Sequence, residues 1–148
     1  MIEKGDLFPD FQLPNESGEI ISFSKFRGSK LVVYFYPKDD TPGCTVEACS
    51  FRDELPQFGN VNVIGISPDS AKSHQKFVSK FGLNFTLLAD EKHELAEACG
   101  IWVEKSMYGK KYMGIERTTY LIDESGIVIH VWVKVKPQDH AKEVFSMI

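Results

Sequence analysis

The sequence predicts an α/β fold in which a central mixed β-sheet is flanked by helices and preceded by an N-terminal β-hairpin. Strand-like and amphipathic helix-like segments alternate along the chain, which is typical of a sheet covered by helices. Two strand-like segments near the end, 118–122 and 127–133, are joined by a short turn and predict an antiparallel hairpin in the same sheet. The chain has 148 residues, of which 43% are hydrophobic, enough for the core of one domain spanning residues 1–148.

The first part of the chain predicts a hairpin and then a buried strand. Between residues 5 and 28, turn-forming residues such as Pro14 and Gly18 separate short apolar pieces, as in a hairpin. The run Leu31–Tyr36 is continuously aliphatic or aromatic, which predicts a strand that is buried on both faces and ended by Pro37.

The middle of the chain predicts two helices around a second strand. Residues 45–58 mix apolar and charged side chains at helical spacing, and Pro56 interrupts this helix near its end. Residues 61–67 predict a buried strand. The helix expected over 70–81 ends at Gly82.

The remaining segments complete the alternation. Residues 85–88 predict a short strand, followed by a helix over 90–99 that is capped by Asp90 and closed by Gly100. After the terminal hairpin, a last helix carries the apolar residues Ala141, Val144, Phe145 and Ile148.

Charge and composition argue against several classes of function. The 17 basic and 21 acidic residues give a formal net charge of −4, which provides no broad attraction for nucleic acid or anionic membranes. The N-terminus lacks a basic stretch followed by an apolar one, and the apolar run 31–36 is far too short to cross a bilayer. We therefore expect a cytoplasmic protein without nucleic-acid or membrane partners.

The three cysteines, Cys44, Cys49 and Cys99, need individual explanations in such a protein. Cytosolic thiols are kept reduced, and a disulfide there is usually transient and catalytic. The cysteines form no C-x-x-C pair, and the four histidines are scattered without metal-ligand spacing, so we expect no zinc site.

Cys44 stands where the first buried strand gives way to a helix. Ligand sites in open α/β sheets lie beyond the carboxyl ends of strands, and a helix N-terminus offers free backbone N–H groups and the positive end of its dipole. Both features favour the thiolate, which is the nucleophilic form of cysteine. Cys44 is therefore the candidate nucleophile.

A thiolate nucleophile also needs an orienting group and positive charge nearby. Thr41, in a loop that begins at Pro37, is the candidate hydrogen-bond partner of a substrate, and Arg117 is the candidate cation. Alternatively, Thr41 only caps the coming helix, and Arg117 pairs at the surface with Glu116 or Asp123. Glu47 either joins Arg117 in a network or only complements the helix dipole.

The spacing P-x-x-x-T-x-x-C, formed here by Pro37, Thr41 and Cys44, resembles the active-site motif of the peroxiredoxins. More narrowly, residues 36–45 together with Cys49 are similar to the bacterioferritin comigratory protein branch, also called peroxiredoxin Q. The similarity covers nearly the whole chain and includes residues 5–13, 105–109 and 116–119.

This resemblance implies a thioredoxin-like fold and a thiol peroxidase that reduces hydrogen peroxide and organic hydroperoxides without a metal or bound cofactor. It implies that Cys44 is the peroxidatic cysteine, supported by Thr41 and Arg117. Cys49 falls where some members carry the resolving cysteine. The implied partner is a thioredoxin-like dithiol reductant, and we expect a monomer, with a weak dimer left open.

The pairing of Cys44 with Cys49 has a geometric consequence. Five residues along a helix separate two Cα atoms by roughly 8 to 9 Å, whereas a disulfide allows at most ~7 Å. We therefore expect the first turn or two of the helix to unwind before a Cys44 sulfenic acid condenses with Cys49. Cys99 is expected in the core, with a role as backup resolving cysteine left open.

Two other classes of function remain open. A thiol–disulfide oxidoreductase would act on protein disulfides, and the absence of C-x-x-C counts against it. A non-enzymatic binding or holdase module on the same fold is the second, because fold does not determine function.

Overall fold

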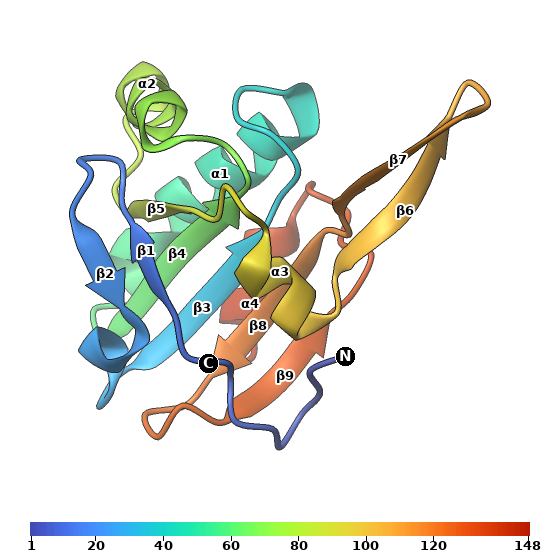
Figure 1. The fold of residues 1–148 in the computed structure, drawn as a ribbon. Coiled ribbons are helices and arrows are strands. Elements are labelled where there is room, and N and C mark those ends of the chain that lie inside the picture. Colours follow the sequence, from blue (N-terminus) through green and yellow to red (C-terminus); the bar gives the residue numbers. More distant parts are fainter.

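A computed structural model describes all residues 1–148 and shows a five-stranded mixed sheet with helices on both faces (Figure 1). The strand order is β5-β4-β3-β8-β9, in which β3, β4 and β5 are parallel while β8 and β9 are antiparallel to their neighbours. Their bounds are β3 Lys30–Phe35, β4 Val61–Ser67, β5 Thr86–Ala89, β8 Thr118–Ile122 and β9 Val128–Trp132. The mixed sheet predicted from the sequence is confirmed.

Two layers cover the sheet. One face carries the N-terminal hairpin of β1 and β2 together with α3, and the other carries α1, α2 and α4 (Figure 1). The bounds are β1 Gln12–Pro14, β2 Ile20–Ser22, α1 Pro42–Glu54, α2 Ala71–Phe81, α3 Glu94–Cys99 and α4 His140–Phe145, with 3₁₀ turns at Phe23–Phe26 and Leu55–Gln57. The predicted N-terminal hairpin and terminal helix are therefore both present.

Alternate side chains of β3 supply the two cores. Val33 and Phe35 lie in the core beneath the hairpin and α3, whereas Val32 and Tyr34 lie in the core beneath α1, α2 and α4. Successive side chains of a strand point to opposite faces, so a central strand covered on both faces contains no polar position. The uninterrupted apolar run in the sequence reflects this double burial.

The packing of α1 on α4 is largely aromatic. His140, the first residue of α4, lies edge-on to Phe51 of α1 with ring centroids 5.9 Å apart. The same imidazole lies edge-on to Trp132 at the end of β9, also at 5.9 Å. Phe51 further contacts Phe145 of α4, so α1 packs against α4 through this buried aromatic residue.

Two helix starts differ from the expectation. Helix α1 begins at Pro42 with Thr41 as its N-cap residue, because proline lacks the N–H that the first helical position leaves unpaired. Cys44 is therefore inside the first turn, whereas the sequence analysis placed it before the helix. Helix α3 begins only at Glu94, yet the carboxylate of Asp90 still accepts hydrogen bonds from the first free N–H groups of that helix.

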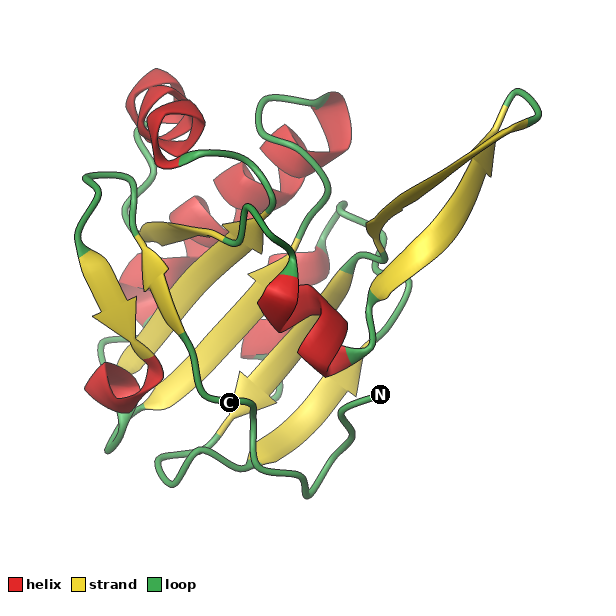
Figure 2. Cartoon of the chain, viewed as in Figure 1, coloured by secondary structure: helices red, strands yellow, loops and turns green.

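A hairpin formed by β6 (Trp102–Met107) and β7 (Lys110–Ile115) extends away from the sheet (Figures 1 and 2). No strands were predicted here, because most of the arm is exposed on both faces. A strand without a buried face has no apolar alternation to reveal it. No helix in the structure has the length and apolar character needed to span a membrane.

Candidate active site

Cys44 is the third residue of α1, just beyond the carboxyl end of β3, and its side chain is 2% exposed. The first helical hydrogen bond of α1 runs from the N–H of Thr45 to the carbonyl of Thr41, at 2.8 Å. The N–H groups of Gly43 and Cys44 precede it and have no partner within the helix. The sulfur therefore lies at the positive end of the helix dipole.

The guanidinium of Arg117 joins Cys44 to a buried carboxylate. Its Nη2 donates to Cys44 Sγ at 3.3 Å, and its Nη1 donates to Glu47 Oε1 at 2.7 Å. Arg117 immediately precedes β8, whose Thr118 is paired with Phe35 at the end of β3. Two residues 73 positions apart in the chain are thus brought to one edge of the sheet.

This arrangement decides between the alternatives left open for Arg117 and Glu47. Arg117 is not a surface partner of Glu116: its side chain is 15% exposed and pairs with Glu47, which is 0% exposed. Glu47 thus belongs to a network with Arg117. Because the carboxylate holds one side of the planar guanidinium, the other side faces the sulfur.

Charges around the sulfur shift the protonation of their neighbours. Burial raises the pKa of Glu47 to about 7, against the attraction of Arg117, which acts to lower it. Burial alone would lower the pKa of Arg117, but the charges of Glu47 and Cys44 raise it. Burial, and then repulsion from Arg117, lower the pKa of Lys105 on β6. Lys105 is therefore a second cation near the site, one that the sequence analysis did not identify.

The raised pKa of Glu47 makes stability depend on pH. Because this pKa is about 7 in the folded state and 4.5 ordinarily, the folded protein retains a proton that the unfolded chain releases between these values. The native state therefore loses stability as the pH rises from 4.5 to about 7. Glu47→Gln removes this titration, so its stability relative to the parent protein is expected to rise by on the order of 3 kcal/mol between pH 5 and pH 8.

Denaturant unfolding of both proteins at the two pH values measures this difference. A free energy of unfolding with the same pH dependence in the parent and in Glu47→Gln contradicts the assignment. Glu54→Gln, at the C-terminal end of the same helix, is the matched control and is expected to leave the pH dependence unchanged.

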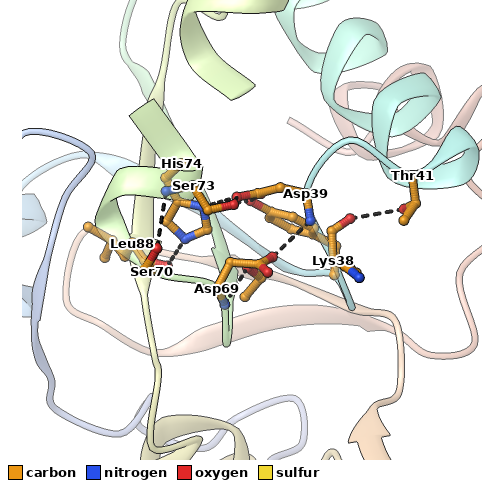
Figure 3. A network of polar contacts seen from close by, with 10 residues as sticks. Lys38, Asp39, Thr41, Asp69, Ser70, Ser73, His74 and Leu88 are labelled. Carbon is orange, nitrogen blue, oxygen red and sulfur yellow. Dashed lines mark hydrogen bonds and ion pairs between the residues drawn. The ribbon is translucent and has the colours of Figure 1, made fainter. Parts of the chain in front are cut away.

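Thr41 is oriented by the loop that precedes α1. Its hydroxyl donates to the backbone carbonyl of Lys38 at 2.9 Å (Figure 3), and its side chain makes no capping hydrogen bond to α1. Because the hydroxyl proton is already donated to Lys38, Thr41 Oγ1 can only accept further hydrogen bonds. No hydrogen bond joins it to Cys44, so its contact with a substrate stays a prediction. Pro37 directly follows Tyr36 at the end of β3 and begins this loop.

The two other cysteines differ sharply in their surroundings. Cys49 lies in α1, five residues after Cys44, and is partly exposed, and all three thiols are free. Cys99 is fully buried in the core beneath α3, where burial raises its pKa to about 12. Cys99 is therefore protonated at neutral pH and packs as the sequence analysis expected.

A second polar cluster lies beside the loop (Figure 3). Asp39 is 8% exposed, and its carboxylate accepts hydrogen bonds from Tyr36 Oη at 2.5 Å and from Ser73 Oγ at 2.8 Å. It also lies 2.7 Å from His74 Nδ1, while the backbone N–H of Asp39 donates to Asp69 at 2.8 Å. This cluster was not predicted from the sequence.

Asp39, Asp69 and His74 are also the residue types that bind metal ions, and their ligand atoms lie within 4.8 Å of one another. Each of these atoms already holds a hydrogen bond within the protein. His74 Nε2 is likewise engaged, with the carbonyl of Leu88 at 3.0 Å. The possible metal-ligand atoms of this cluster are therefore already hydrogen-bonded within the protein, and these hydrogen bonds account for the cluster without a metal ion.

The fold and the site together define a class of protein. A thioredoxin-like sheet that presents a cysteine at the N-terminus of a helix, in contact with an arginine, is the arrangement of a thiol-dependent redox enzyme.

Comparison with known proteins narrows this class. A family model described as the AhpC/TSA family matches residues 4–131. Peroxiredoxin Bcp of Bacillus subtilis is 48% identical over 99% of this chain and 95% of that protein, and its Escherichia coli K12 counterpart is 43% identical over 99% and 96%. Among solved structures, the bacterioferritin comigratory protein of Xanthomonas campestris, described for its alkyl peroxide reduction activity, superimposes with a TM-score of 0.90 and 39% identity, covering 99% of this chain and 95% of that one.

The chain therefore belongs to the AhpC/TSA family and, within it, to the Bcp or peroxiredoxin Q branch. It is a thiol peroxidase.

Proposed function

We propose that this peroxidase reduces hydrogen peroxide and organic hydroperoxides through the sulfur of Cys44. The observation that carries the proposal is the 3.3 Å contact between Arg117 Nη2 and Cys44 Sγ at the start of α1. The thiolate attacks the terminal oxygen of ROOH, so an S–O bond forms while the O–O bond breaks. Cys44 becomes a sulfenic acid, and the departing alkoxide takes a proton from solvent to give ROH. The alkyl peroxide reduction reported for the Xanthomonas campestris relative supports this substrate class.

The neighbouring residues have distinct roles in this reaction. Arg117 stabilises the thiolate and the negative charge that develops on the substrate oxygens, and Glu47 fixes the orientation of the guanidinium. Thr41 accepts the hydrogen bond of the hydroperoxide O–H, because its own proton is given to Lys38. Pro37 restricts the loop that carries Thr41.

We propose that Cys49 resolves the sulfenic acid. Its thiol attacks Cys44 Sγ, a disulfide forms and water leaves. Both cysteines lie in α1, so at least the first turns of this helix must unwind before the sulfurs meet. A thioredoxin-like dithiol protein then reduces the disulfide, and the enzyme works as a monomer in the cytoplasm.

Cys49→Ser separates the two steps. The variant is expected to keep the first oxidation within about threefold of the parent rate, because the contacts at Cys44 remain, but to lose turnover with a thioredoxin system. Quenched-flow oxidation followed by mass spectrometry measures the first step, and peroxide consumption measures turnover. The mass of the parent protein treated with one equivalent of peroxide is expected to show a Cys44–Cys49 disulfide.

Cys99→Ala is the matched control and is expected to retain both steps, since Cys99 lies in the core. A dominant Cys44–Cys99 disulfide, or turnover that survives in Cys49→Ser, removes Cys49 from the resolving role.

A further inference from the structure

We propose that Asp39 and His74 are positioning residues of this peroxidase. Their buried ion pair anchors the loop before α1, so that unwinding of α1 begins at Asp40 and leaves the loop in place. The unwinding itself rests on the proposed function, whereas the anchor exists in the reduced enzyme and is measured there independently.

The anchor ties the loop to two other elements. Asp39 contacts His74 and Ser73 of α2 through its carboxylate, and its backbone N–H donates to Asp69 in the turn after β4 (Figure 3). Tyr36, the residue after β3, donates to the same carboxylate. Asp39 is therefore held both by its neighbour Tyr36 and by a region of the chain 30 to 35 residues further on.

Hydrogen-bond geometry assigns the charges of the pair. His74 Nε2 lies 3.0 Å from the carbonyl of Leu88, which can only accept, so this nitrogen must carry a proton. His74 Nδ1 lies 2.7 Å from the Asp39 carboxylate, which accepts there too. His74 is therefore an imidazolium, and the pair consists of opposite charges on side chains that are 0% and 4% exposed.

A buried pair of this kind resists separation. Removing one partner leaves an uncompensated charge in a site with little access to water, which is strongly destabilising in proteins. Moving Asp39 away from His74 would leave the same uncompensated charge. The loop is therefore much harder to displace at Asp39 than at exposed positions.

A hinge follows the anchor directly. Asp40 adopts φ +57°, the left-handed region that non-glycine residues seldom occupy, and it is exposed. Its side chain forms an exposed ion pair with Lys80 and no other hydrogen bond or ion pair, and such a pair contributes little to stability. The strained and weakly held residue thus separates the anchor from Thr41, the N-cap of α1.

The consequence concerns the return to the active conformation. After the disulfide is reduced, α1 must reform with Cys44 against Arg117. If Asp39 stays in place, the chain refolds from a fixed point, and Thr41 returns to the same position relative to β3. The pair thus positions Thr41 and Cys44 without touching the substrate.

A double-mutant cycle tests the pair in the reduced enzyme. Asp39→Asn and His74→Gln each leave one buried charge unmatched and are expected to slow the first oxidation of Cys44 about tenfold, whereas the double variant removes both charges. The rate of the double variant is expected to be about tenfold higher than the rate calculated by multiplying the two single effects.

Asp40→Asn is the matched control, because it makes the same change of charge at the next residue, where asparagine tolerates a positive φ. It is expected to stay within about twofold of the parent rate. Additive effects, or equal slowing by Asp40→Asn, overturn the proposal.

The extent of unwinding is tested on the unmodified protein by NMR of the histidine side chains. Two N–H signals of His74, assigned by their absence in His74→Gln, are expected in the reduced form and unchanged in the disulfide form. Loss of the Nδ1–H signal on oxidation means that unwinding reaches Asp39 and overturns the proposal, and so does a single N–H signal in the reduced form. If no Cys44–Cys49 disulfide forms, the proposed resolving step fails, while the cycle still reports on the anchor.

Discussion

Cys44→Ser is expected to abolish peroxide reduction, with a loss of more than about 10⁴-fold in the rate of peroxide consumption. The serine hydroxyl is not ionised at neutral pH, and Arg117, which supports a thiolate through a 3.3 Å contact, has no anion to support. Serine is close to cysteine in size, so α1 and its packing are expected to remain. Peroxide consumption with excess reductant measures the loss.

Circular dichroism and thermal unfolding verify that the variant is folded. Peroxide turnover retained in folded Cys44→Ser contradicts the assignment of the nucleophile. Suppression of protein aggregation that persists in the inactive variant would instead reveal a holdase activity independent of the sulfur.

Arg117→Lys is expected to slow the first oxidation of Cys44 by about 10² to 10³-fold, although the positive charge is retained. The guanidinium uses two nitrogens to reach Cys44 and Glu47 at once, at 3.3 and 2.7 Å. An ammonium group is a single point of charge, so it is drawn to the Glu47 carboxylate and leaves the sulfur. Quenched-flow oxidation under single-turnover conditions measures the effect on the chemical step.

Arg27→Lys serves as the matched control, because Arg27 is exposed and its guanidinium lies over the ring of Phe23, 5.6 Å from its centre. It is expected to oxidise at the parent rate. If Arg117→Lys does so as well, the fork geometry of the guanidinium has no part in catalysis and general positive charge is sufficient.

The sheet was predictable where burial leaves a trace in the sequence. The run 31–36 is apolar throughout because both faces of β3 are covered, and the terminal hairpin shows a turn between two apolar segments. The arm 102–115 lacks such a trace, since neither face of most of it is buried. Helix α1 was predicted to begin at residue 45, whereas it begins at Pro42, because proline is well suited to the first position of a helix.

The candidate site was predictable in its residues but not in its pairings. The spacing of Pro37, Thr41 and Cys44 is local, so it can be recognised without a structure. Whether Arg117 would meet Glu47 depends on β8 lying beside β3, which only the sheet order decides. The partners of Asp39 are harder still to predict, because His74 follows 35 residues later on a separate helix and no spacing rule relates the two residues.

The aromatic contact between α1 and α4 gives the molecule an intrinsic optical reporter. Phe51 and Trp132 face the same imidazole of His140, which burial keeps neutral at pH 7 by lowering its pKa to about 4. Unwinding that reaches Phe51 uncovers one side of the His140 imidazole and alters the surroundings of the Trp132 indole. Unwinding as far as Phe51 is thereby expected to appear in each catalytic cycle as a change in emission from Trp132, without any added dye.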